Sequence, residues 1–124
     1  EVNGEIHLLF GRNDIKLPEG KAKKLEATGY VDRSVIIGIR PENIHNEEMY
    51  LQQMPDSVVD AKVEVVEMLG SETLLYLDID GTNGNVCAKV SSRTKVRPGD
   101  VIKVAIDANK IHVFDKETEK TIIN

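Results

Sequence analysis

Short apolar runs separated by turn-forming residues fill most of the chain. Such runs are typical of β-strands, because successive side chains of a strand point to opposite faces of a sheet. One stretch, Lys21–Thr28, instead predicts a helix, with Ala22 and Leu25 facing inward and Gly29 placed to end it. The pattern predicts a mainly β protein, a small barrel or sandwich with one short helix. The expected strands cover residues 4–10, 34–40, 59–68, 73–79, 85–91, 101–106 and 111–114.

Two of these strands have patterns that predict which faces are buried. Ser34–Arg40 is a nearly continuous β-branched run, which indicates a strand covered on both faces. In 59–68 the apolar residues alternate with polar ones, so they should share one buried face. These residues are Val59, Ala61, Val63 and Val65.

Turn-forming residues predict two of the connections. The loop Asp80–Gly84 contains two dipeptides that favour tight turns, so 73–79 and 85–91 should form a hairpin. Arg97–Asp100 has Pro and Gly at the positions that a type II turn requires.

Other segments carry weaker signals. Residues 11–14 (Gly-Arg-Asn-Asp) predict a turn after the first strand. Asn43–Asp56 is polar and is expected to be a loop or a single irregular turn. The last two strands, 101–106 and 111–114, should pair with each other, and the charged tail from Asp115 should fray.

Size and charge narrow the possible functions. A chain of 124 residues fits one domain, or two very small lobes that share a core. The formal net charge of −5 disfavours a nucleic-acid or anionic-membrane binder, which needs clustered Lys and Arg. The single cysteine, Cys87, cannot form an internal disulfide, which favours a reducing compartment such as the cytoplasm. The chain opens on Glu1 rather than Met, which we interpret as a piece of a longer protein.

The motifs of common catalytic sites are missing from the sequence. A phosphate loop requires GxxxxGK[ST], and the one Gly-Lys pair, Gly20-Lys21, is followed by Ala22. A calcium loop counted from Asp78 would need Gly and Glu where Asn83 and Lys89 stand. The histidines are scattered, without the spacing of metal ligands: His7, His45 and His112. The sequence therefore predicts no enzyme, no metal site and no cofactor in this chain.

Three motifs, in this order, resemble a known family. Ile37–Ile44 (IGIRPENI) is similar to a strand-to-turn motif in the C-terminal domain of ABC-importer ATPase subunits. Val63–Thr73 (VEVVEMLGSET) resembles the next motif of that domain in its sugar-importer form. Val96–Asp100, followed by Ile111–Phe114, resembles its closing hairpin. The resemblance covers essentially the whole chain, residues 1–124.

The resemblance implies a fold, a role and partners. It implies an OB-like barrel of the transport-associated (TOBE) type, related to molybdate-binding (MOP-like) modules. In the family this domain follows a nucleotide-binding domain, which is absent here and which alone would bind ATP and Mg²⁺. The domain holds two ATPase subunits together as a homodimer and, in some members, receives signals from a regulatory protein. The parent subunit would sit in the cytoplasm, on the inner face of the membrane, against permease subunits of a maltose, multiple-sugar or glycerol-phosphate importer.

Two groups of residues are candidates for contacts between domains or subunits. The first lies in the family motifs: Arg40, Pro41, Glu42, Gly70, Ser71 and Glu72. The second lies in the 45–57 segment, which matches no family motif, and is apolar: Met49, Tyr50, Leu51 and Met54. Each group also has a purely structural interpretation. Arg40 and Glu42 could pair locally, and the apolar residues of 45–57 could cover the end of the barrel itself.

Two other functions compete with this interpretation. An oxyanion-binding module would use backbone amides and hydroxyls, for which the candidates are Ser71, Thr73, Ser91 and Ser92. A nucleic-acid-binding barrel needs stacking aromatics on a basic face. The sequence supplies few aromatics in an acidic chain: Phe10, Tyr30, Tyr50, Tyr76 and Phe114.

Overall fold

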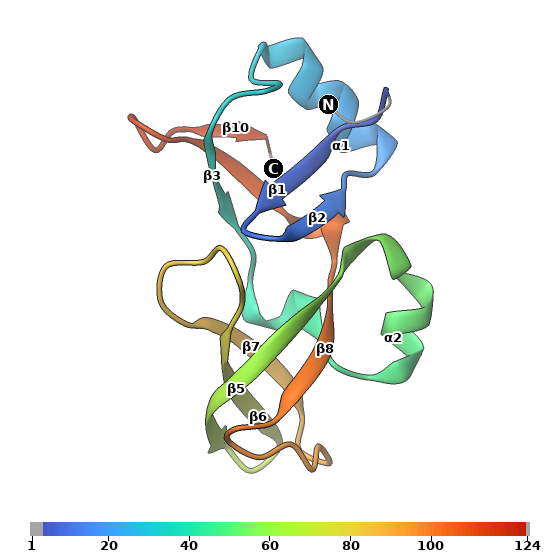
Figure 1. Ribbon diagram of the computed structural model, residues 1–124, viewed down its shortest axis with the longest axis vertical. Helices are drawn as coiled ribbons and strands as arrows, with labels where there is room; N and C mark the ends of the chain where they lie inside the picture. The colour runs from blue at the N-terminus through green and yellow to red at the C-terminus, as the bar shows by residue number, and fades with distance from the viewer. Residues whose placement is uncertain (1–3, 124) are drawn as a thin grey trace.

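The computed structural model describes residues 4–123, which form two lobes stacked along the long axis (Figure 1). The lower lobe is a five-stranded antiparallel sheet in the order β4-β8-β5-β6-β7. Its edge strands β4 and β7 lie against each other, so the sheet nearly closes into a barrel. The strands are β4 (Ile44–His45), β5 (Val58–Met68), β6 (Glu72–Asp78), β7 (Val86–Ser91) and β8 (Val101–Ile106). The mainly β fold with a small barrel, as predicted from the sequence, is confirmed.

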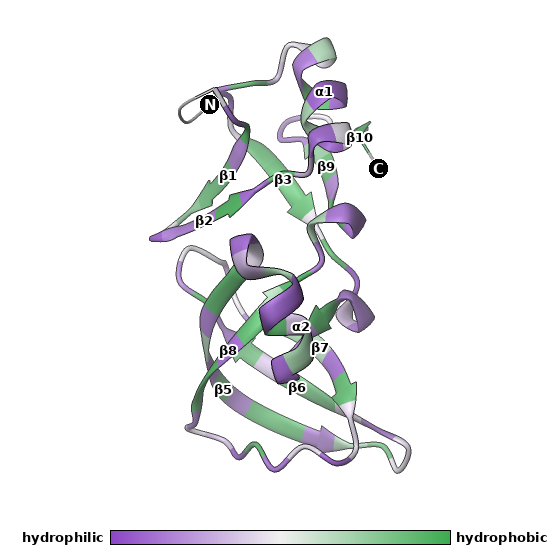
Figure 2. Ribbon diagram, turned by 90° about the vertical axis from the view of Figure 1, so that its right-hand side faces the viewer, coloured by the Kyte–Doolittle hydropathy of each residue, from purple (hydrophilic) through white to green (hydrophobic). Residues whose placement is uncertain are grey.

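Alternation of side chains builds this barrel. Along β6, Thr73, Leu75 and Leu77 point into the core and are almost fully buried, while the residues between them face outward. Figure 2 shows an alternation of hydrophobic and hydrophilic residues along β5. The predicted hairpin of β6 and β7 is confirmed. The predicted turn after Arg97 is confirmed as well, with Gly99 at φ 92° and the Asp100 N–H donating to Arg97 O over 3.1 Å.

The upper lobe contains two separate sheets and one long helix. Strands β10, β9 and β3 form one sheet, and β1 and β2 form a hairpin. The helix α1 packs against β10. One hydrophobic core runs through both lobes, including Leu8 and Ile111 above and Val63 and Val104 below. The bounds are β1 (His7–Phe10), β2 (Asn13–Lys16), α1 (Glu19–Thr28), β3 (Val35–Gly38), β9 (His112–Asp115) and β10 (Thr121–Ile123).

The predicted helix exists and is two residues longer at its start. It follows Pro18 and ends at Gly29, whose φ of 77° is the left-handed conformation expected for a C-terminal glycine. Lys21 lies on its inner face with only 8% of its surface exposed. Burial, followed by the charges of Lys24 and Lys110, lowers the pKa of Lys21.

The segment predicted as a loop or irregular turn contains a helix, α2 (Glu48–Gln53), so that prediction was wrong. The helix packs against β8 of the lower lobe. It has six residues, and no side chain caps its start at Glu47. A helix this short is not stable in isolation, so the contacts with β8 stabilise it. The sequence of the segment alone therefore did not predict a helix. Three single-turn 3₁₀ segments complete the chain: η1 (Pro41–Asn43), η2 (Pro55–Ser57) and η3 (Ala108–Lys110).

Predictions about strand pairing near the ends were wrong. Residues 101–106 and 111–114 do not pair, because β8 joins β4 and β5 in the lower lobe while β9 joins β3 and β10 in the upper. The short η3 segment carries the chain from one lobe to the other. The tail does not fray within the described residues, since β10 pairs with β9 and Ile123 is buried.

Three finer predictions were also wrong. Asn13 and Asp14 were assigned to a turn, yet they begin β2, and the turn is the two residues Gly11-Arg12. The strand β3 is not covered on both faces, since Ile36 is 38% exposed. Val65 does not share the buried face, because a bulge shifts the register of β5 between Val63 and Val65.

Candidate functional site

The two lobes meet where the tip of the β1–β2 hairpin rests on the β6–β7 turn. The Asp80 carboxylate accepts a hydrogen bond from the Arg12 N–H over 2.6 Å, and the Asn13 side chain donates to Asp80 O over 2.9 Å. Gly11 and Gly81 approach so closely that a Cβ on either would collide with the other turn. Asp80 therefore joins the two lobes. Arg12 and Asp80 are 68 residues apart, so the sequence pattern alone could not predict that they touch.

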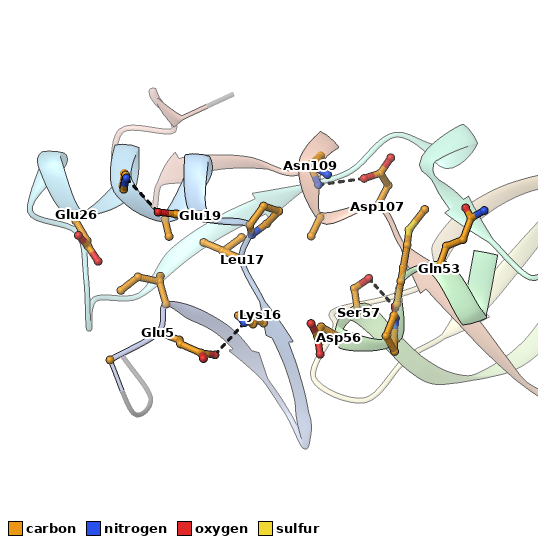
Figure 3. Close-up of a pocket in the computed structure, with 18 residues that line it drawn as sticks. Glu5, Lys16, Leu17, Glu19, Glu26, Gln53, Asp56, Ser57, Asp107 and Asn109 are labelled. Atoms are coloured by element: carbon orange, nitrogen blue, oxygen red, sulfur yellow. Dashed lines mark hydrogen bonds and ion pairs between the residues drawn. The ribbon is translucent and has the colours of Figure 1, made fainter. Parts of the chain in front are cut away.

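A cleft of about 810 Å³ separates the lobes on the side of α1 and α2 (Figure 3). Its walls carry Glu5, Glu19, Glu26, Asp56 and Asp107 among other residues. Lysines neutralise part of this charge: Lys16 pairs with Glu5 at 3.4 Å and Lys23 with Glu19 at 3.1 Å. The Lys16 ammonium holds the pKa of Glu5 below its usual value. The cleft remains acidic and open to solvent.

The apolar residues of the 45–57 segment are partly used inside the molecule. The Tyr50 ring stacks on His45, with ring centroids 3.8 Å apart and planes 11° from parallel. Met54 lines the interlobe cleft, and Leu51 is half-buried. Met49 is 53% exposed and is available for an outside contact. The structure thus places Tyr50 and Met54 in positions where they also cover the protein's own surface.

The motif residues Arg40, Pro41 and Glu42 lie on the segment that links β3 above to β4 below. Pro41 begins the η1 turn, and the Asn43 N–H donates to Arg40 O over 2.9 Å. Arg40 and Glu42 are exposed, and no ion pair joins them in the part of the chain that the structure describes. Their charged groups are therefore free of the local pairing considered above.

Gly70 and Ser71 lie in the turn from β5 into β6, and Glu72 is the first residue of β6. Gly70 has a φ of 87°, and the Leu69 N–H donates to Glu72 O over 2.8 Å. The Glu72 carboxylate pairs with Lys89 at 3.4 Å. The sequence candidates therefore lie on three separate elements, η1, α2 and this turn.

The hydroxyls considered for oxyanion binding do not form one site. Thr73 is buried inside the barrel, whereas Ser91 faces outward and accepts a hydrogen bond from the Arg93 N–H over 3.2 Å. Ser71 and Ser92 are exposed, and the Glu72 carboxylate lies on the strand opposite Ser91. A fixed negative charge at this position opposes binding of an anion.

Sequence reasoning missed the outer face of the barrel, which we define by six residues of three adjacent strands. Because of the bulge, Val65 points outward and pairs with Tyr76, which in turn pairs with Cys87. The next row along the strands is Glu67, Leu74 and Lys89. The Glu67 charge raises the pKa of Tyr76, and burial followed by the Glu67 charge raises the pKa of Cys87.

An apolar slot of about 940 Å³, which we call the seam, opens between β1 and β3. Consecutive residues of β1 and of β3 line the seam. Because successive side chains of a strand point to opposite faces, each strand borders the seam with its backbone edge. No ladder joins β1 to β3 in the described part of the chain. In the β1–β2 hairpin, closed by a two-residue turn, the pairs Phe10–Asn13 and Leu8–Ile15 exchange hydrogen bonds. The N–H and C=O of His7 and Leu9 therefore point into the seam.

Comparison with known proteins decides the family. The TOBE domain family matches residues 37–114, which include all five strands of the lower barrel, the second half of β3 and most of β9. The chain belongs to the TOBE domain family. The MalK OB fold domain family matches residues 1–44, so the two matches together span both lobes. The resemblance recognised from the three sequence motifs is confirmed.

Several relatives of this TOBE domain are ATP-binding proteins of sugar importers. The oligosaccharides import ATP-binding protein MsmX of Bacillus subtilis is 43% identical over 113 residues, 91% of this chain and 30% of that protein. The multiple sugar-binding transport ATP-binding protein MsmK of Streptococcus mutans is 41% identical over 108 residues, 87% of this chain and 28% of that protein. The trehalose/maltose import ATP-binding protein MalK of Thermococcus litoralis is 39% identical over 91% of this chain and 30% of that protein.

The TOBE domain thus spans less than a third of the length of these relatives. Within residues 4–123, none of the helices has the length and apolar character needed to span a membrane.

Proposed function

We propose that residues 1–124 are a single regulatory and dimerisation domain in the ATP-binding subunit of an ABC sugar importer. The observation that carries this proposal is the match of the chain to the TOBE domain and MalK OB fold domain families, together with identities of 41–43% to the ATP-binding proteins MsmX and MsmK. The parent subunit would work in the cytoplasm, against membrane-spanning permease subunits, and would also be open to a regulatory protein.

In this proposal the domain itself does no catalysis. ATP and Mg²⁺ bind in the nucleotide-binding domain of the parent subunit, since no GxxxxGK[ST] run occurs in residues 1–124. The TOBE domain instead keeps two subunits paired while their nucleotide-binding domains close on ATP and part after hydrolysis. A body in which one core runs through both lobes suits this role, because it transmits force without deforming.

The candidates for contacts with the nucleotide-binding domain or a regulator remain those of the family motifs and of α2. Arg40 and Glu42 are exposed on the interlobe link, and Gly70 and Ser71 are exposed on the β5–β6 turn. The full proposed set is Arg40, Pro41, Glu42, Gly70, Ser71, Glu72, Tyr50 and Met54.

The experiment compares the parent subunit with a version that lacks residues 1–124, in sedimentation without nucleotide. We expect the intact subunit to be dimeric and the truncated one monomeric, while the truncated one still binds Mg-ATP. Equal dimerisation of both versions would contradict the proposal. Calorimetric titration of the TOBE domain alone with Mg-ATP should be flat, and stoichiometric binding there would contradict the assignment of ATP to the other domain.

A further inference from the structure

The seam leaves the backbone edges of two strands without a partner strand. On one side β1 bonds to β2 through its other edge, and on the other side β3 bonds to β9 alone in the described part of the chain. The N–H and C=O of His7 and Leu9 therefore face a gap rather than a ladder. Backbone groups buried without partners cost free energy, and an open edge of this kind is a template for a further strand.

The directions of β1 and β3 suit one strand between them. Both run from the end of the upper lobe near α1 towards the lower lobe (Figure 1). The turn after β1 touches the β6–β7 turn, and β3 leads through η1 into β4. A strand that runs the opposite way in the seam is antiparallel to both neighbours. It would join the hairpin and the three-stranded sheet into one sheet in which every neighbouring pair is antiparallel.

The side chains around the seam are apolar on both faces. The buried core residues Ile79 and Ile111 line its floor. On the outer face Leu9 is 65% exposed and Ile36 is 38% exposed. A strand in the seam would cover the floor with one set of side chains and lie between Leu9 and Ile36 with the other. Apolar residues exposed next to an open edge are typical of a surface that is covered in the complete protein.

The start of β1 indicates where such a strand comes from. Asn3-Gly4 is a dipeptide that favours a two-residue hairpin turn, and Gly4 has the positive φ, 82°, that this turn requires. Glu5 would close the turn by bonding to the strand before it. The Leu17 N–H donates to Ile6 O over 2.9 Å, so Ile6 bonds towards β2 and Glu5 must bond away from β2. The turn therefore directs the preceding segment onto the seam edge of β1.

We propose that the segment of the parent subunit that precedes Glu1 fills the seam as a strand, the seam strand, bonded to both β1 and β3. This inference rests on the proposed function, in which this chain is one domain of a longer subunit, as it is less than a third of MsmX and MsmK. A segment of the same polypeptide is favoured over a separate peptide, because a short turn already holds it beside β1 and little association entropy is lost.

The turn also sets the register of the seam strand. With Glu5 closing a two-residue turn, the first and third residues before Glu1 face His7 and Leu9 and bond to them. The polypeptide that arrives from the nucleotide-binding domain then enters through the middle of the upper sheet. The two domains of the subunit are joined by a strand rather than by a free linker, so movement of the first domain acts directly on β1 and β3.

Amide hydrogen exchange of the parent subunit tests this placement. The comparison is with a version in which about eight residues before Glu1, enough for one strand, are replaced by a Gly-Ser sequence. His7 and Leu9 should exchange about a hundredfold faster in the Gly-Ser version, because their N–H groups lose their partners. Leu8, which bonds to Ile15 in both versions, is the internal control and should change far less. Equal exchange of His7 and Leu9 in the two versions would overturn the proposal.

A disulfide tests the register. In the parent subunit a cysteine at the third residue before Glu1 should cross-link to Leu9→Cys on oxidation, because Cα atoms of a bonded antiparallel pair are about 5.5 Å apart. Asp14→Cys is the matched control, since Asp14 is exposed on β2 directly opposite Leu9. It lies two strand spacings, about 10 Å, from the same cysteine and should not cross-link. Cross-linking to Asp14→Cys rather than to Leu9→Cys would overturn the placement beside β1.

The outcomes separate this inference from the dimerisation role. Protection of His7 and Leu9 in a subunit that sedimentation shows to be monomeric would support the seam strand and contradict the dimerisation role. A dimeric subunit in which the Gly-Ser replacement changes neither amide would overturn the seam strand and leave the dimerisation role standing.

Discussion

The lower barrel and the upper lobe differ in how their strands are joined. In the lower barrel each strand of the five-stranded sheet is hydrogen-bonded to its neighbours, and the edges β4 and β7 lie against each other. In the upper lobe a hairpin and a three-stranded sheet face each other across the seam. The comparison indicates that the lower barrel is the rigid body that carries contacts. The upper lobe is held to it by the shared core and by the contact at Asp80.

The largest expected effect comes from the closed barrel. Leu77→Ala removes a fully buried side chain from β6 and should lower the free energy of unfolding by about 2–5 kcal/mol. Urea denaturation followed by circular dichroism measures this change. The control Leu9→Ala, at a side chain 65% exposed on β1, should stay within about 0.5 kcal/mol. Equal losses for the two variants would contradict the placement of Leu77 in the core of the barrel.

The next prediction tests the junction between the lobes. Gly81→Ala should destabilise the protein by more than the roughly 1–2 kcal/mol that a positive φ alone costs, because its Cβ would collide with the Gly11 backbone. Gly84→Ala is the matched control, since Gly84 lies in the same turn with φ 79° and no atom within 4 Å of the added Cβ. Urea denaturation of the pair isolates the collision. Equal effects would show that the hairpin tip does not rest on this turn.

A smaller effect is expected from pH in the upper lobe. The Tyr30 hydroxyl donates to the Asp115 carboxylate over 2.5 Å, and backbone N–H groups of Thr118 and Glu117 donate to it as well. These bonds lower the pKa of Asp115 from 3.8 to about 2. The folded pKa lies below the unfolded one, so this stabilisation is present above pH 3.8 and is lost as pH falls towards 2.

Thermal unfolding measured from about pH 5 down to about pH 2 covers the range between the unfolded and folded pKa values of Asp115, 3.8 and about 2. Asp115→Asn should have a flatter pH profile than the original protein over this range. Tyr30→Phe, which keeps the ring and removes only the donor, should flatten the profile in part. Profiles that coincide for all three proteins would contradict the role assigned to this carboxylate.

The smallest expected effect is local. Amide hydrogen exchange should be faster at His7 and Leu9, whose N–H groups point into the seam, than at Leu8, which bonds to Ile15 across the hairpin. Residues of β6 should exchange most slowly, because both neighbours of this strand are bonded to it. Equal protection at His7, Leu8 and Leu9 would show that the seam is closed in solution.

The difference in strand pairing between the lower barrel and the upper lobe also explains which parts of the fold the sequence could predict. The bounds of β5, β6 and β7 were predicted to within one residue, because these strands pair in chain order, β5 with β6 and β6 with β7. The partners of β8 and β9 could not be predicted, since β8 bonds to β5 and β9 to β3, far back in the sequence. The sequence candidates Arg40 and Gly70 came from the family resemblance. The outer face depends on the bulge in β5 between Val63 and Val65. A bulge adds one unpaired residue to a strand, and the alternating pattern of 59–68 does not show where that residue lies.

Sedimentation equilibrium of this chain over a wide range of concentration tests the account most directly. The account predicts that the chain forms a reversible dimer, in keeping with the dimerisation role proposed for it. A dissociation constant on the order of micromolar or weaker is expected for a small contact. A chain that remains monomeric at the highest concentration would contradict the account.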